Sequence, residues 1–514
     1  MTRALADTVL ELTQRPLDRW AVAATLESTG VRDVDARERY GKRDIFDLAD
    51  EVYALCLAAE ATIPAEEEEE RPRFALARRY LRGGFFFIQV ALQLGSLAFL
   101  GYGQWASLEF SGRQASVVGM ALVLAFLLTG PTSQAIGYVG SFFSESGKHL
   151  LAARAVAAVF ALGVALLLVG AALVVAANLP FGWYDNRSLG AGLVYFALVG
   201  WVSLTGALLY MLKQFAAMVV ATVLGIAVVG LMLNQAGFGI YAAQWIGLGV
   251  SIAIETTWAA VAIARRRRST TPELRLAKMP PLGVLGMLVT PYLIYGLAYF
   301  GLLFADRLAA WSAGAHGLPF TFRAPYEVGL DWALIAVVPA LAMLEVTIYL
   351  FSQRLAAVAS RYAIGSAAEH NRQLLHFRRR HSTYVLGLLV LGAAVTTGVL
   401  YLLAQGHATK VSALFSDAIT LRVYVLGVVG YALLVCGLFN GVFLFSIGRP
   451  WYVVRAIVPG VAVAVAGSLA LSRAFDYWAA AGGLVAGCAV FALLAAVTAT
   501  RALRGVDYHY FAAY

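Results

Sequence analysis

Two carboxylates lie deep inside long apolar runs of this sequence. Glu255 lies 15 residues into the run 240–264, and Glu345 lies 15 residues into the run 330–351. A carboxylate at that depth in a membrane is costly, and by default it marks a function, a buried pair or a water-filled cavity. Such a pair of acids could bind protons or a cation and couple their entry to movement. Alternatively, each acid could simply pair with a nearby arginine, such as Arg265 or Arg354.

Three further polar side chains are candidates for a substrate or ion pathway. Asp306 and Arg307 follow the apolar run 282–305. Asp306 could pair with an arginine of a neighbouring lobe while Arg307 faces a polar portal, or both groups could serve only in structural pairs. Asn440 could bind a hydroxyl group of a substrate, or it could hydrogen-bond two helices together. The sequence alone leaves these alternatives open.

Two prolines inside apolar runs are candidates for gating kinks. Pro291 and Pro339 each remove a backbone donor and clash with the preceding turn of a helix. Such positions are tolerated in membrane helices because neighbouring groups or water can satisfy the freed carbonyl. Because Pro339 precedes Glu345 by six residues, bending there could change where the carboxylate points.

Searches for catalytic motifs fail. The sequence has no GxxxxGK[ST] phosphate loop, no His/Cys cluster with metal-ligand spacing and no visible nucleophile with its base. We therefore expect a protein that is not an enzyme and that needs neither a metal nor a cofactor.

The composition is that of a polytopic membrane protein. Hydrophobic residues make up 61% of the 514 residues and charged residues only 13%, against about 25% charged in soluble domains. A membrane helix needs about 20 apolar residues. On this basis we predict an all-α protein with about twelve spans, and 11–13 as the range: 83–108, 115–141, 151–177, 189–212, 215–236, 240–264, 282–305, 330–351, 384–404, 421–446, 452–471 and 477–500.

The basic residues are distributed unevenly between the two sides of the predicted membrane. With the N-terminus inside, and counting from Arg78 onward, 22 lysines and arginines fall on the cytoplasmic side and seven on the other. This asymmetry follows the positive-inside rule. It predicts a multi-pass protein of the inner (cytoplasmic) membrane with both termini in the cytoplasm. It also explains the net charge of +9 without a nucleic-acid partner.

Polar segments divide the chain into predicted domains. The segment 265–281, with Arg265–Arg268 and two prolines, separates six spans from six, which indicates two lobes. The predicted units are a small helical cytoplasmic domain (1–64), a charged linker (65–82), an N-terminal lobe (83–264), a linker (265–281), a C-terminal lobe (282–500) and a cytoplasmic tail (501–514).

Two cytoplasmic segments have patterns of their own. Residues 1–64 contain helix caps at Gly30, Gly41 and Asp44, and they are expected either to pack on the membrane lobes or to dock a partner. Residues 352–383 are amphipathic and basic, which predicts a helix on the membrane surface. The histidines of this insert are expected to be solvated: His370, His376 and His381.

A family resemblance appears in residues 291–345. The pattern Phe304-Ala-Asp306-Arg307 with Trp311, followed by Pro325-Tyr326-Glu327 and Ile335-Ala-Val-Val-Pro339, resembles the PelG family of polysaccharide exporters. That family belongs to the multidrug/oligosaccharidyl-lipid/polysaccharide (MOP) flippase superfamily. The resemblance extends in layout over residues 80–500 and weakly includes 421–451. Family members often have Asp-Lys where this chain has Asp306-Arg307, and they usually lack its N-terminal segment.

The resemblance implies a transporter that exports a polysaccharide or a lipid-linked glycan by alternating access. It also implies a cytoplasmic glycosyltransferase and other membrane subunits as partners, beside the lipid bilayer itself. Two rivals remain. One is a membrane scaffold that transports nothing and recruits partners through its cytoplasmic segments. The other is an integral-membrane glycosyltransferase, which is disfavoured because no long extracytoplasmic loop carries acids or histidines.

Overall fold

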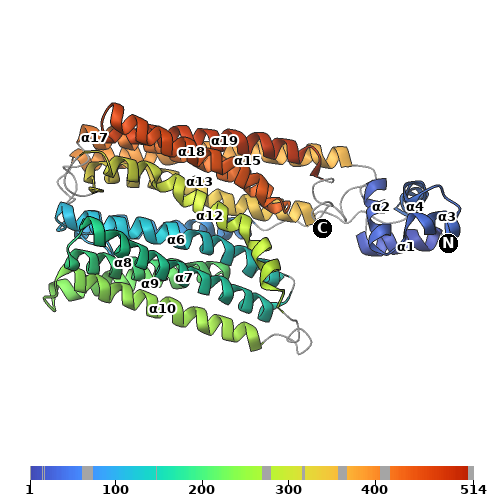
Figure 1. Cartoon of the computed structure of the whole chain (residues 1–514). Coiled ribbons are helices and arrows are strands. Elements are labelled where there is room, and N and C mark those ends of the chain that lie inside the picture. The colour runs from blue at the N-terminus through green and yellow to red at the C-terminus, as the bar shows by residue number, and fades with distance from the viewer. Residues whose placement is uncertain are drawn as a thin grey trace.

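In the computed structural model the polypeptide is helical throughout the membrane region (Figure 1). The structure describes residues 2–13, 16, 18–60, 73–145, 147–268, 279–314, 319–356, 367–405 and 417–506. Residues 65–72 of the predicted linker 65–82, the middle of 265–281, part of 352–383 and the end of the tail 501–514 lie outside the described residues.

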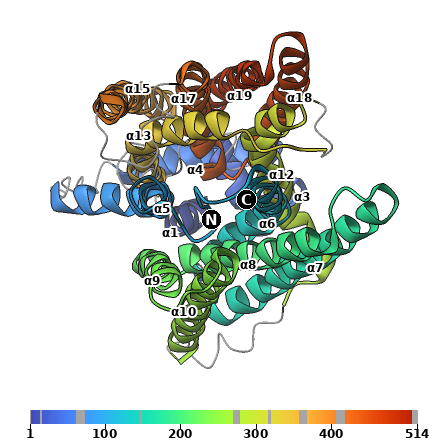
Figure 2. The same ribbon diagram turned by 90° about the vertical axis from the view of Figure 1, so that its left-hand side faces the viewer.

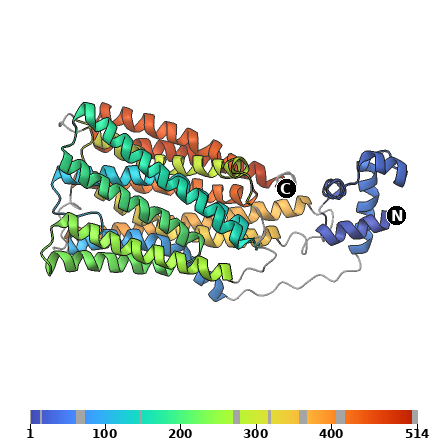
Figure 3. The same ribbon diagram turned by 60° about the horizontal axis from the view of Figure 1, so that its bottom comes forward.

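The first four helices form a small bundle with its own core. They are α1 (Thr2–Thr13), α2 (Arg19–Ser28), α3 (Asp33–Tyr40) and α4 (Ile45–Glu60). Asp18 caps α2, and Gly41 ends α3 in the left-handed conformation at φ 67°. Leu48 and Val52 of α4 are fully buried against Val22 and Leu26 of α2. Figures 1 and 3 show this bundle beyond one end of the membrane helices, which we call the inner end; the opposite end is the outer end.

Eleven helices are long and apolar enough to cross a membrane, within the described part of the chain. They are α6 (Gly112–Glu145), α7 (His149–Phe181), α8 (Asn186–Met211), α9 (Phe215–Asn234), α10 (Ile240–Arg268), α12 (Leu282–Trp311), α13 (Ala324–Ala356), α15 (Ala367–Gln405), α17 (Ala418–Ser446), α18 (Pro450–Ala474) and α19 (Ala480–Leu503). The predicted all-α membrane fold is confirmed, and the chain is a multi-pass integral membrane protein.

The helix α5 (Arg73–Leu100) precedes these spans, and its segment Ala91–Leu100 is apolar. It ends eight residues before the predicted boundary at 108, because Gly101 takes the left-handed conformation at φ 89°. The following residues fold back as a turn with a bridge between Tyr102 and Ser107. Within this turn Gln104 is buried and hydrogen-bonds both Gln93 of α5 and Ser251 of α10.

The predicted surface helix at 352–383 is wrong over its described second half. Residues from Ala367 onward are the first turns of α15, which continues without a break to Gln405. Apolar and histidine side chains of these turns are buried against neighbouring helices, and Phe377 contacts Phe351 of α13 and Phe443 of α17. The expectation of solvated histidines is also wrong for His370 and His381, which are 1% and 5% exposed.

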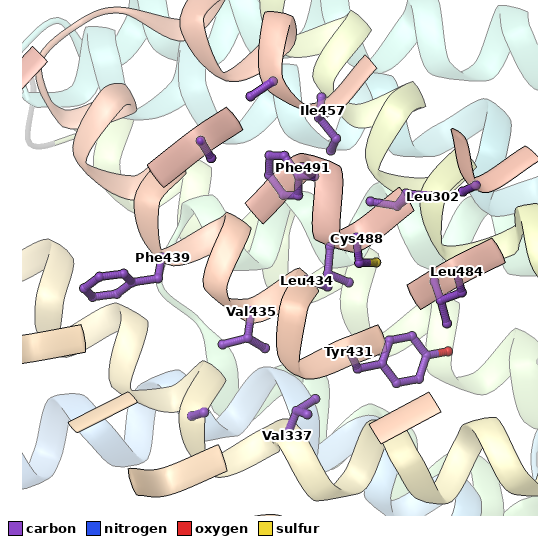
Figure 4. Close-up of a cluster of buried hydrophobic side chains, with 14 of the residues drawn as sticks. Leu302, Val337, Tyr431, Leu434, Val435, Phe439, Ile457, Leu484, Cys488 and Phe491 are labelled. Atoms are coloured by element: carbon purple, nitrogen blue, oxygen red, sulfur yellow. The ribbon is translucent and has the colours of Figure 1, made fainter. Parts of the chain in front are cut away.

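The membrane helices pack in a pattern that occurs twice. Within α5–α10, the packed pairs are α5 with α9, α6 with α7 and α8, and α10 with α8 and α9. The later helices repeat these pairs as α12 with α18, α13 with α15 and α17, and α19 with α17 and α18. Their buried apolar side chains form two clusters, of which Figure 4 shows one around Leu434, Cys488 and Phe491.

The two sets meet through two helix pairs that also correspond to each other. These pairs are α5 with α13 and α12 with α6, and Figure 2 shows α5, α6 and α12 between the remaining helices of the two sets. The α6–α12 crossing is close because Gly130 and Gly296 face each other. A Cβ added to Gly296 would lie 2.6 Å from the carbonyl oxygen of Gly130.

Candidate functional site

A cluster of charged side chains is buried between α12 and α13 near their outer ends. The guanidinium of Arg307 pairs with the carboxylate of Glu327 and, at 3.1 Å, with that of Asp331. Trp311 donates its indole N–H to the second oxygen of Glu327 at 2.8 Å. The hydroxyl of Tyr431, from α17, lies 3.4 Å from the guanidinium (Figure 4 shows this tyrosine from the side of the apolar core).

Helical spacing brings these residues together. Arg307 and Trp311 are four residues apart on α12, so they share one face of that helix. Glu327 and Asp331 are also four residues apart and share one face of α13. The loop between the two helices lets these faces meet at the outer end. The face of α12 that carries Arg307 and Trp311 is therefore packed against the face of α13 that carries the two carboxylates.

The cluster contains more acids than bases. Asp306 is fully buried beside Arg307, and one of its oxygens accepts a hydrogen bond from Tyr326 at 2.7 Å. Its other oxygen, Oδ1, is buried without a partner among the described residues. Three carboxylates face one guanidinium here, so the net charge would be −2 if all four groups were ionised. Such an excess in a low dielectric favours uptake of a proton.

The structure places both Asp306 and Arg307 in contacts within the protein. Asp306 contacts a tyrosine hydroxyl rather than another helix's arginine. Arg307 is buried in two ion pairs rather than open to a polar portal, because α13 brings two carboxylates to it. Glu327 and Asp331 were missed as site residues. Their signal was the i, i+4 spacing of two acids at the start of an apolar run.

Glu345 lies at a contact between the two sets of helices. Its carboxylate accepts a hydrogen bond from the Tyr210 hydroxyl of α8, near the inner end. On its other side α5 passes closely, since a Cβ on Gly83 would lie 3.0 Å from the Glu345 Cβ.

Glu255 is in a different place, inside the first set. It is 1% exposed and accepts a hydrogen bond from the Thr205 hydroxyl of α8 at 2.6 Å. Its expected alternative partner, Arg265, forms no ion pair with it in the described part of the chain. Glu255 and Glu345 therefore do not form one paired site, although α8 supplies a hydroxyl to each.

Asn440 lies in a third environment, at the inner end of α17. Its side-chain oxygen accepts from the Arg378 guanidinium of α15 at 2.9 Å, and its amide donates to the Cys436 carbonyl at 2.7 Å. Both groups of the asparagine are thus used in contacts within the protein. These contacts match the alternative in which Asn440 joins helices.

Both prolines lie inside continuous helices, Pro291 in α12 and Pro339 in α13. Two backbone carbonyl groups of α13 near Pro339 are contacted by neighbouring helices. Tyr80 of α5 donates to the Pro339 carbonyl at 3.1 Å, and Gly392 of α15 approaches the Ala336 carbonyl. Whether the prolines act as gating kinks stays a prediction.

No family model matches the sequence, and no curated protein matches it either. The structure, however, is similar to solved transporters. A mutant of the Vibrio cholerae MATE transporter VcmN is 17% identical, with 85% of this chain and 98% of that chain covered and a TM-score of 0.60. A MOP superfamily transporter from Pyrococcus furiosus is 16% identical, with 84% and 96% covered and a TM-score of 0.58.

A third similar structure is an outward-facing multidrug resistance MATE family transporter of the MOP superfamily. It is 15% identical, with 84% of this chain and 96% of that chain covered and a TM-score of 0.58. At these identities the likeness concerns the arrangement of the helices. The chain therefore has the fold of the MATE transporters of the MOP superfamily.

Proposed function

We propose that the protein is a membrane transporter that exports a polysaccharide or a lipid-linked glycan by alternating access. The shared fold supports transport, and the sequence resemblance at residues 291–345 supports a glycan as the cargo. The observation that carries the proposal is the repeated packing, which gives two similar sets of six helices, α5–α10 and α12–α19. Two such units can rock against each other around a site between them.

The contact between Tyr210 and Glu345 is the part of this arrangement suited to a gate. It joins α8 of the first set to α13 of the second near the inner end. In alternating access the inner ends must separate when the cargo enters from the cytoplasm. One hydrogen bond between side chains can break and reform at modest cost.

The charged cluster at Arg307 is our candidate for energy coupling. Its excess of carboxylates would be relieved by a bound proton, and Asp306 Oδ1 has no partner to compensate its charge. A movement of α12 against α13 would change the pairing of Arg307 with Glu327 and Asp331. Proton uptake and helix movement would thereby be linked.

The protein would act in the inner membrane beside a cytoplasmic glycosyltransferase and other membrane subunits. The N-terminal bundle carries an exposed aromatic pair, Trp20 at 55% and Phe46 at 49%, with ring centroids 5.2 Å apart. Exposed aromatic residues are frequent at protein interfaces. This pair is our candidate contact for the synthetic partner.

Reversible cross-linking tests the proposal. The cysteine pair Tyr210→Cys and Tyr349→Cys keeps Glu345, because Tyr349 lies one turn after it on the same face of α13. Joining the two cysteines with a reducible bifunctional thiol reagent should block appearance of glycan at the cell surface. Adding a reductant should restore it. Surface glycan is measured per amount of the protein in the membrane. The matched control is Trp201→Cys with Thr256→Cys, a pair in contact at 3.4 Å within the first set, whose cross-linking should leave export intact.

The same experiment distinguishes the transporter from the membrane scaffold that transports nothing. Unchanged export from the cross-linked 210/349 pair would exclude alternating access and favour the scaffold, which needs no movement at this contact. Proteoliposomes can be tested with a cationic dye and with a lipid-linked oligosaccharide. Movement of the dye alone would support a transporter but contradict a glycan as its cargo.

A further inference from the structure

An apolar pocket opens between the outer halves of α6, α7 and α8. Its lining includes Val117 and Leu124 of α6, Val174 of α7, and Leu193 and Phe196 of α8. On α6 this face is opposite the one that meets α12 at Gly119 and Gly130. The pocket therefore lies on the outer flank of the first set, away from the contact between the two sets.

The pocket has the depth of one leaflet. From the start of α6 to Leu124 is about 18 Å at about 1.5 Å per residue, and half of a bilayer core is about 15 Å thick. Figure 2 shows α7 at the edge of the molecule. Phe181 and Trp183 stack at its outer end with centroids 4.5 Å apart, which is typical of the membrane–water interface.

A polar group without a protein partner lies at the mouth of this pocket. The hydroxyl of Tyr184 is buried and has no hydrogen-bond partner among the described residues. The tyrosine is held in place by Asn178, whose side chain accepts from the Tyr184 N–H at 2.9 Å and donates to its carbonyl at 2.8 Å. A buried hydroxyl fixed in this way needs a partner from outside the protein.

A cationic side chain lies beside Tyr184. Arg113 at the start of α6 is on the same helix face as Val117, is half-exposed and pairs with Asp185 at 2.9 Å. An apolar pocket, a hydroxyl at its mouth and an arginine above it follow the order of groups in a phospholipid: acyl chain, ester and phosphate.

We propose that this pocket binds one acyl chain of a glycerophospholipid from the leaflet at the outer ends. The chain fills the space between α7 and α8, an ester oxygen accepts a hydrogen bond from the Tyr184 hydroxyl, and the phosphate lies near Arg113. The lipid then completes the packing of α7 on its neighbours. This holds whichever solute the protein moves.

Native mass spectrometry of the full chain, purified in mild detergent from a defined phospholipid mixture, tests the site. The wild-type protein should retain one phospholipid under activation that removes the others. Val174→Trp fills the pocket and should abolish this retention. Tyr184→Phe removes only the hydroxyl and should lower retention about fivefold, the value of one hydrogen bond. The control Leu168→Trp lies on α7 at a side chain that is 69% exposed and outside the lining, and it should retain the lipid.

Leu193→Trp fills the pocket from α8 and replaces Val174→Trp if that variant does not fold. A phospholipid with a diazirine at the end of its acyl chain should label peptides that contain Val174 or Leu193. Equal retention by wild type and both tryptophan variants would overturn the proposal. So would wild-type protein that retains an isoprenyl lipid there instead of a phospholipid.

Discussion

At the scale of single residues, the arginine at position 307 decides whether the outer end of α12 can be buried. A guanidinium in an apolar interior is tolerated only when its donors are paired. Glu327 and Asp331 supply that pairing, and Trp311 fixes the far oxygen of Glu327. The cluster is thus held by charge and geometry together, which makes each member sensitive to loss of the others.

Replacing Arg307 with methionine should destabilise the membrane region by about 3–5 kcal/mol, because the carboxylates of Glu327 and Asp331 lose the cation with which both pair. The measurement is thermal unfolding of the purified protein. Arg372→Met breaks an ion pair whose arginine side chain is 76% exposed, and it should cost less than about 1 kcal/mol. Adding Glu327→Gln to Arg307→Met should recover part of the loss. Equal unfolding temperatures for Arg307→Met and Arg372→Met would contradict this account.

Glu345→Gln should fold normally and strongly reduce export. Glutamine keeps an oxygen that can accept the Tyr210 hydroxyl, so the contact survives while the charge is lost. Glu255→Gln should reduce export less, because its contact with Thr205 lies within one set of helices. Surface glycan is measured against the amount of folded protein. Normal export from the double glutamine variant would remove both acids from the coupling mechanism.

At the scale of elements, the length of the apolar runs predicted where the helices lie, but it did not predict where they end. The expected helix to position 108 fails at Gly101, and the sequence could not show that Gln104 is held by Gln93 and Ser251. The basic stretch before the ninth predicted span looked like a surface helix, because charge pattern alone cannot reveal burial. His370, Phe377 and His381 are buried by helices distant in sequence, whereas His376 is exposed.

The candidate site was only partly predictable for the same reason. Asp306, Arg307 and Glu345 stand out as charges in apolar runs, which is a local signal. Their partners are not local: Tyr210 is 135 positions from Glu345, and Tyr431 is 124 positions from Arg307. Only the spacing of Glu327 and Asp331 on one helix face was available in advance.

The α6–α12 crossing gives a prediction for helix packing. Gly296→Ala would place a methyl group 2.6 Å from a backbone oxygen that cannot move away easily, and overpacking of this kind costs about 1–3 kcal/mol. The amount of monodisperse protein after gel filtration should fall. Gly286→Ala is the matched control on the same helix, since its added Cβ meets nothing within 4 Å. Equal yields of the two variants would show that the crossing relaxes freely.

At the scale of the whole molecule, the N-terminal bundle should unfold independently of the membrane region. Its core is separate, and a domain of about 60 residues is only marginally stable. Leu48→Ala removes a fully buried side chain and should cost about 2–5 kcal/mol. Limited proteolysis of the full chain should then cut within residues 1–60 and leave the membrane region intact. Leu57→Ala, at a side chain 41% exposed, should remain resistant, and cutting of both variants alike would contradict a separate core.

The orientation of the molecule follows from counting both charges and crossings. If α5 crosses the membrane together with the eleven apolar helices, the chain crosses an even number of times, and the basic residues place its two ends in the cytoplasm. In a background with Cys56, Cys436 and Cys488 replaced by alanine, an impermeant thiol reagent added outside should label Ala236→Cys, between α9 and α10. It should label Ala24→Cys and Ala368→Cys only after the cells are opened, because most basic residues would otherwise have to cross the membrane. If position 368 were labelled from outside intact cells together with position 236, we would conclude that α13 or α15 does not cross the bilayer. Labelling of position 24 alone from outside would mean that α5 does not cross, and the bundle would then face away from any cytoplasmic partner.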